Sequence, residues 1–224
     1  MASLTHFEKE LAELKEHLLT MASHAEAAVK QSVQALMTRD YDLALTVLAG
    51  DEVLDRFEVE IDEMAINLLA KAPLASDLRL ISVTMKISQN LERVGDEATK
   101  IAKRARDLSD DAPLKLVVNI PQLSEQALRT LKTALDTFVN QDPAAARALI
   151  PQDKAIDELN KKIHQELANQ MIESPDTVTR CLHWMVASKS LERIADHAKN
   201  IAEEVVYLYE ARDIRHTLKA SPAA

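Results

Sequence analysis

The chain has 224 residues, a length that suits one large domain or two small ones. Hydrophobic residues make up 47% of it, which is enough for a folded core and excludes extensive disorder. Only 2 glycines and 7 prolines occur, too few turn residues for a protein built from sheets. The composition therefore predicts an all-α protein.

The formal net charge of −9 argues against a nucleic-acid-binding protein, which normally presents a basic face. Cys181 is the only cysteine, so a disulfide framework and a thiolate metal site are both excluded. No apolar run approaches the roughly 20 residues that a membrane span needs. The first residues carry acids and do not resemble a signal or transit peptide. We therefore expect a cytoplasmic protein.

Prolines and turn-like clusters divide the chain into six long segments with helical periodicity. Pro143 suits the first turn of the fifth segment, and Ser174 followed by Pro175 is typical of the start of the sixth. In chain order, the predicted helices cover residues 4–37, 41–70, 76–108, 122–140, 143–172 and 174–212.

The two halves of the chain resemble each other. Residues 88–102 read SQNLERVGDEATKIA and residues 188–202 read SKSLERIADHAKNIA, with eight of 15 positions identical. The preceding segments match at an offset of 102, so that Asp51 corresponds to Asp153 and Asp55 to Asp157. This repeat predicts a tandem duplication of two three-helix bundles, each helix burying one apolar stripe.

We accordingly predict two bundles joined by a linker and followed by a loose tail. The first bundle covers residues 1–110, the linker 111–121, the second bundle 122–214 and the tail 215–224.

Acidic side chains gather beside the core stripes of the second and third helices of each half. Asp51, Asp55, Glu58 and Asp62 share one flank of the second helix, and Glu92 and Asp96 are neighbours on the third. Like charges at this spacing destabilise a helix by about 0.2–0.5 kcal/mol per pair, so we expect a cation to offset them. Oxygen ligands suit hard divalent cations or iron. His164 stands in the place of Asp62 in the second half.

The same acidic pairs also fit an ordinary solvated surface, which is their commonest role on helices. Arg93 and Arg193 are placed to neutralise them. His197 is expected on the polar surface, and Cys181 and Trp184 in core or interface packing. No Glu-x-x-His, His-Glu-x-x-His or glycine-rich phosphate loop occurs, so nothing specific points to catalysis.

Leu91-Glu92-Arg93-Val94-Gly95-Asp96 and Leu191-Glu192-Arg193-Ile194-Ala195-Asp196 resemble the duplicated Glu/Asp-x-x-x-Asp signature of the PhoU family. Ser76-Asp77-Leu78-Arg79 resembles the family's Asp-Leu-Arg opening of the third helix. In the second half, Thr177-Val178-Thr179 replaces that motif, so an equal role in both halves is not expected. The resemblance spans residues 5–213.

The resemblance implies a cytoplasmic, homodimeric regulator that is not an enzyme. Such a protein restrains phosphate uptake and the phosphate-starvation response, as an adaptor between the ATPase subunit of a phosphate ABC transporter and a sensor histidine kinase. It would bind no nucleic acid and would reach the membrane only through these partners. The resemblance also implies divalent or iron-type metal ions on the acidic motifs. The expected ligands are Glu92, Asp96, Glu192 and Asp196, completed by Asp51, Asp55, Asp153 and Asp157.

Two alternatives compete with the regulator. A carboxylate-bridged metalloenzyme would show turnover on phosphoesters or peroxide and would want histidine near the acids, where only His164 fits. A metal-free helical scaffold would be equally stable with and without divalent metal.

Overall fold

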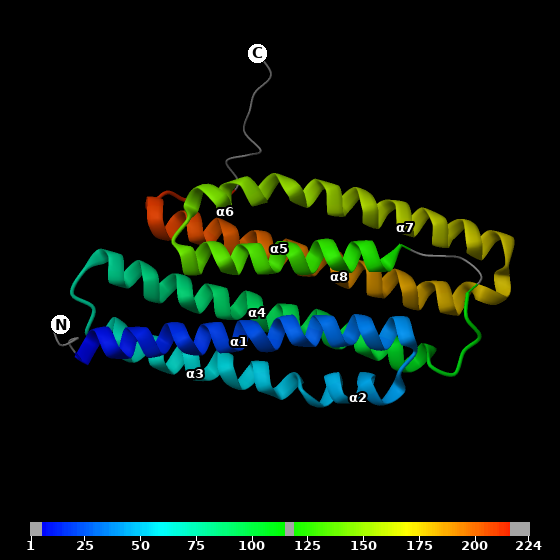
Figure 1. Cartoon of the computed structure of the whole chain (residues 1–224), viewed down its shortest axis with the longest axis horizontal. Coiled ribbons are helices and arrows are strands. Elements are labelled where there is room, and N and C mark those ends of the chain that lie inside the picture. The colour runs from blue at the N-terminus through cyan, green and yellow to red at the C-terminus, as the bar shows by residue number, and fades with distance from the viewer. Residues whose placement is uncertain (1–5, 115–118, 216–224) are drawn as a thin grey trace, which may run out of the picture.

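The computed structural model describes residues 6–114 and 119–215, and in these ranges all regular structure is helical (Figure 1). The first half contains α1 (His6–Thr38), α2 (Tyr41–Ala49), α3 (Asp51–Leu69) and α4 (Ala75–Leu108). The second contains α5 (Ile120–Asn140), α6 (Pro143–Leu149), α7 (Asp153–Glu173) and α8 (Val178–Glu210), with short 3₁₀ turns at Ile150–Gln152 and Pro175–Thr177. The predicted all-α class and the duplicated bundle are confirmed.

The long helices α4 and α8 lie side by side in the middle of the molecule, with α1–α3 on one side and α5–α7 on the other (Figure 1). The predicted stripe on α4 is the core of the first half, since Ile87, Leu91, Val94 and Ala98 are fully buried. Cys181 is also fully buried and Trp184 packs against the core, as predicted. The apolar stripes thus position α4 and α8 with their polar flanks near each other.

The turn between the first two helices is repeated in both halves. Arg39 and Gln141 adopt left-handed backbone conformations with φ of 60° and 57°. The next residues, Asp40 and Asp142, cap α2 and α6 by accepting a hydrogen bond from the backbone N–H three residues on, at 2.9 Å in each case. The duplication therefore extends to turn chemistry.

The second predicted helix of each half is broken, whereas the sequence predicted continuous helices over 41–70 and 143–172. Gly50 separates α2 from α3, and Pro151, which has no backbone N–H, lies in the 3₁₀ turn before α7. The breaks place Asp51 and Asp153 in the first turns of α3 and α7. A carboxylate is favourable there because the first backbone N–H groups of a helix have no partner within it.

Gly95 allows α3 to approach α4 closely. A β-carbon added to Gly95 would overlap Cδ1 of Leu54, far inside van der Waals contact. Because Leu54 lies between Asp51 and Asp55 in the chain, this approach brings the acidic side of α3 to Glu92 and Asp96.

We expect Gly95→Val to lower the free energy of unfolding by about 1–3 kcal/mol, since Leu54 must leave its packed rotamer. Urea denaturation measures the loss. Gly50→Ala is the matched control: an added β-carbon there lies 3.5 Å from the carbonyl oxygen of Val47, an ordinary contact, so stability should be kept. A Gly95→Val variant that unfolds with the wild-type midpoint would contradict this packing.

Helices α4 and α8 run antiparallel across the boundary between the halves. Lys86 of α4 pairs with Glu204 near the end of α8, and Glu97 pairs with Arg193 near its middle. Arg104 near the end of α4 contacts His183 near the start of α8. The two halves are therefore related by an approximate two-fold axis that crosses this helix pair.

The boundaries predicted for the bundles stay predictions. Residues 115–118 of the predicted linker and residues 216–224 of the predicted tail lie outside the described residues. Within the described ranges, no helix has the length and apolar character needed to cross a bilayer.

Candidate metal centre

Four of the predicted ligands lie within electrostatic range of one another where α3 packs against α4. This first acidic cluster contains Asp51 and Asp55 of α3 and Glu92 and Asp96 of α4. Burial, followed by the charges of Asp51 and Asp96, raises the pKa of Asp55. Burial, together with the charges of Asp96, Glu58 and Asp55, raises the pKa of Glu92 to about 7 against the opposing effect of Arg93. The cluster therefore concentrates negative charge in a partly desolvated place.

The equivalent residues lie within electrostatic range of one another where α7 packs against α8. This second acidic cluster contains Asp153, Asp157, Glu192 and Asp196. Burial is the main reason that the pKa of Asp157 is raised, and the charges of Asp153 and Glu192 add to it. The same three causes raise the pKa of Asp196 to about 6. In each half, the predicted residues of the two helices therefore lie within electrostatic range of one another, and their role as a common site stays a prediction.

Side-chain cations already contact both clusters. Arg93 lies 3.3 Å from Glu92 Oε2 and 3.3 Å from Asp96 Oδ2. In the second cluster, Lys199 Nζ donates to Asp153 Oδ2 at 2.7 Å, and Lys189 pairs with Glu192. Arg193, expected to neutralise its own half, instead crosses to Glu97 of the other half.

The donor atoms fit a hard cation. The first cluster offers only carboxylate oxygens. The Thr99 hydroxyl donates a hydrogen bond to one of them, Asp51 Oδ1, at 2.9 Å. Glu92 Oε2 and Glu192 Oε2 are buried and are held only by their ion pairs with Arg93 and Lys189, whereas Asp153 Oδ1 in the second cluster is buried without a hydrogen-bond partner. As the described side chains stand, no three of the His, Cys, Asp and Glu residues converge closely enough to hold an ion. Metal binding thus requires side-chain rotation and stays a prediction.

His164 does not join the second cluster. Its Nε2 lies 2.9 Å from the hydroxyl oxygen of Ser188. In the first half, the equivalent residue Asp62 lines a cleft with Glu58 and Lys86 instead.

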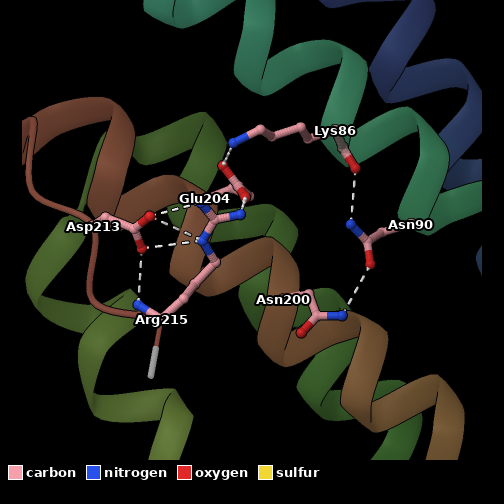
Figure 2. A network of polar contacts seen from close by, with 6 residues as sticks. All are labelled: Lys86, Asn90, Asn200, Glu204, Asp213 and Arg215. Atoms are coloured by element: carbon pink, nitrogen blue, oxygen red, sulfur yellow. Dashed lines mark hydrogen bonds and ion pairs between the residues drawn. The ribbon is translucent and has the colours of Figure 1, made fainter. Parts of the chain in front are cut away.

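A polar network between α4 and α8 was missed by the sequence analysis (Figure 2). Glu204 is buried between Lys86 of α4, at 3.0 Å, and Arg215 of the segment that follows α8, at 3.3 Å. Beside it, the Asn200 amide donates to Asn90 Oδ1 at 3.3 Å. The network joins the two halves across their boundary.

His197 belongs to the same boundary, so its assignment to the polar surface was wrong. The ring is half-buried, and its Nδ1 lies 3.1 Å from Asn90 Oδ1. Burial is the main reason that the pKa of His197 is lowered. Periodicity placed this residue outside the core stripe but gave no information about the second bundle that covers it.

Fold and acidic clusters together define a duplicated helical-bundle protein with one carboxylate motif in each half. The family model described as the PhoU domain matches residues 18–105 and again residues 120–205, one match in each half. The chain belongs to the PhoU family, which confirms the resemblance seen in the Leu-Glu-Arg motifs.

Curated relatives carry the same family name. The chain is 41% identical over 221 residues to the phosphate-specific transport system accessory protein PhoU homolog of Pseudomonas putida, covering 96% of this chain and 86% of that protein. It is 33% identical over 211 residues to the phosphate-specific transport system accessory protein PhoU of Escherichia coli (strain K12), covering 94% and 88% of the two chains.

Solved structures agree with the fold. PhoU from Pseudomonas aeruginosa superposes with a TM-score of 0.89 at 38% identity, covering 92% of this chain and all of that one. The phosphate transport system regulatory protein PhoU from Streptococcus pneumoniae has a TM-score of 0.87 at 25% identity, covering 93% and 99%.

Proposed function

We propose that the chain is a cytoplasmic negative regulator of phosphate uptake and of the phosphate-starvation response. The observation that carries this proposal is its likeness, over nearly the whole length of both chains, to proteins named as accessory to the phosphate-specific transport system. The Streptococcus pneumoniae protein is named as regulatory, which supports the same role.

In this proposal the protein is a homodimeric adaptor rather than an enzyme. It bridges the ATPase subunit of a phosphate ABC transporter and a sensor histidine kinase. It changes the kinase only through different affinities for the two kinase states, as any binding partner must. The charged faces of the bundles provide the electrostatic complementarity that selects partners and orients them.

We further propose that metal ions bind at the acidic clusters and alter this docking surface. Coupled carboxylates are ligands for hard divalent cations and iron. A bound cation would relieve the repulsion among them and reverse part of the local charge.

Complementation tests the regulatory role. In bacteria that lack their own PhoU and grow with ample phosphate, a starvation reporter should be active. Expression of this chain should restore its repression, and continued reporter activity with a well-folded chain would overturn the proposal.

Elemental analysis tests the metal. Wild-type protein purified without chelator should contain metal. The metal should be absent from the fourfold variant Glu92→Gln/Asp96→Asn/Glu192→Gln/Asp196→Asn. Circular dichroism should show that this variant keeps the helicity of the wild type. A matched control removes four exposed carboxylates, in Glu13→Gln/Glu16→Gln/Asp110→Asn/Asp136→Asn, and should keep the metal. Equal metal content in the first variant and wild type would exclude the acidic clusters.

A further inference from the structure

The duplication allows the surroundings of the two acidic clusters to be compared position by position. Thr99 and Lys199 are equivalent at the offset of 100 residues. Each contacts the equivalent aspartate: Thr99 Oγ1 donates to Asp51 Oδ1 at 2.9 Å, and Lys199 Nζ donates to Asp153 Oδ2 at 2.7 Å. One half thus has a neutral hydroxyl where the other half has an ammonium.

The Lys199 ammonium is held inside the second cluster rather than beside it. Its side chain is 31% exposed and that of Asp153 only 12%. Lys199 also lies within electrostatic range of Asp196. A positive charge at hydrogen-bond distance from these oxygens supplies the attraction that a metal ion would supply. A metal would have to compete with this ammonium for the same carboxylate oxygens, and the two positive charges would repel each other at close range.

The other neighbours increase the difference between the clusters. Glu58 lies close enough to the first cluster to act on Glu92, whereas the equivalent position in the second half carries the uncharged Asn160. The second cluster also has a second ammonium, because Lys189 pairs with Glu192. The first cluster has only one cation that contacts its carboxylates within the described residues.

That cation is Arg93, and it is placed at the edge of the first cluster. Its side chain is 55% exposed, and both of its contacts with the carboxylates measure 3.3 Å. Because a flexible, exposed guanidinium turns into solvent at little cost, Arg93 blocks an incoming cation far less than Lys199 does.

We propose that Lys199 is the resident cation of the second acidic cluster, so that the first cluster alone takes a metal ion. This inference rests on the metal binding in the proposed function and adds to it which half binds and which residue decides. The two halves then have different roles: the first responds to metal supply, while the second keeps its lysine counter-charges whatever the metal supply.

The test uses equilibrium dialysis of the full chain against Mn²⁺ alone, followed by measurement of bound metal per chain. Glu92→Gln/Asp96→Asn should lose the bound Mn²⁺, and Glu192→Gln/Asp196→Asn should retain it. Lys199→Thr should add a second Mn²⁺ to each chain. The converse change, Thr99→Lys, should weaken binding to the first cluster by at least about tenfold, since it places a unit charge against the metal.

Lys154→Thr is the matched control for net charge. Lys154 is exposed and adjacent to Asp153 in the chain, so its removal changes the total charge equally and should add no Mn²⁺. Thr99 is buried, and circular dichroism must show that Thr99→Lys is folded. If Thr99→Lys is not folded, the Lys199→Thr variant alone tests the proposal.

The outcomes separate this inference from the proposals on which it rests. Equal loss of Mn²⁺ in the two double variants, or no gain in Lys199→Thr, would overturn the role of Lys199 while leaving metal binding in place. Absence of Mn²⁺ from every variant and from wild type would overturn both the inference and metal binding by this ion. Neither result would affect the regulatory role, which complementation tests independently.

Discussion

Removal of both cations that contact Glu97, in Lys100→Met/Arg193→Met, is expected to lower the free energy of unfolding by about 3 kcal/mol. Glu97 is 4% exposed and lies on α4 at the boundary between the halves. Its Oε1 accepts from Lys100 Nζ at 2.8 Å and from Arg193 Nη1 at 3.3 Å. Without these partners, the buried carboxylate keeps a hydrogen bond from Ser190 but loses both of the cations that contact it, and this is far more costly than the loss of a surface ion pair.

The pKa of Glu97 supports this expectation. Burial alone would raise it, yet hydrogen bonds from Lys100, Ser190 and Arg193 hold it below the ordinary value for glutamate. The folded state therefore favours the charged form, and its stabilisation is present above the unfolded pKa and lost as the pH falls through the folded one. The double variant reverses this preference.

Urea denaturation at neutral pH measures the effect, and a triple variant controls for the shortened side chains. Glu97→Gln/Lys100→Met/Arg193→Met removes the buried charge with its partners and should recover most of the lost stability. If the double and triple variants have the same stability, the loss comes from packing of the long side chains and not from the unpaired carboxylate.

The acidic clusters could be predicted because they depend on local periodicity. Asp51 and Asp55 lie one turn apart on one flank, as do Glu92 and Asp96, and a three-helix bundle must place these flanks together once its apolar stripes are buried. The duplicated motif then located the same arrangement in the second half. These inferences needed only helix geometry and the order of the elements.

The contacts of Glu97 and Glu204 could not be predicted in the same way. Both residues lie off the apolar stripe of their own bundle, where periodicity indicates solvent. Their burial results from the antiparallel packing of α4 against α8, which brings together residues about 100 positions apart in the chain. Nothing in the pattern of one bundle specifies the orientation of the other.

The role of Lys199 was missed for a different reason. Lysines near acids in a helix usually form weak, solvated pairs, and Lys199 in the sequence looks like one of these. The repeat does contain the signal, because Thr99 stands at the equivalent position. Only the contact of each residue with its aspartate shows that the difference falls inside the acidic clusters.

Stability of the metal-free protein is expected to depend on pH through Glu92 and Asp196. Burial, followed by neighbouring carboxylates, raises the pKa of Glu92 from 4.5 to about 7 and that of Asp196 from 3.8 to about 6. Each group binds its proton more tightly in the folded state. Its stabilising contribution is therefore fully present below the unfolded pKa and is lost as the pH rises through the folded pKa. As the pH rises from 5 to 8, the two groups together should lower the free energy of unfolding by about 2–4 kcal/mol.

The variant Glu92→Gln/Asp196→Asn isolates this contribution, because neutral amides do not titrate. Burial lowers the pKa of His197, so this residue lowers stability as the pH falls below its unfolded pKa, which is the opposite direction. His197 is present in both the variant and the wild type, so its contribution cancels in their difference. The difference in unfolding free energy between variant and wild type should therefore favour the variant increasingly from pH 5 to pH 8. Urea denaturation in the presence of EDTA at several pH values gives this difference.

A control with two exposed carboxylates removed, Glu16→Gln/Asp110→Asn, should give a curve parallel to that of the wild type. If Glu92→Gln/Asp196→Asn also runs parallel to the wild type, the two carboxyl groups are solvated in solution, and the repulsion inferred for the clusters is absent. A widening difference would show that the folded chain holds these carboxylates together at a cost. For Glu92, in the first cluster, that cost is the electrostatic free energy that a bound cation would recover, and it links the stability of the bare protein to its proposed affinity for metal.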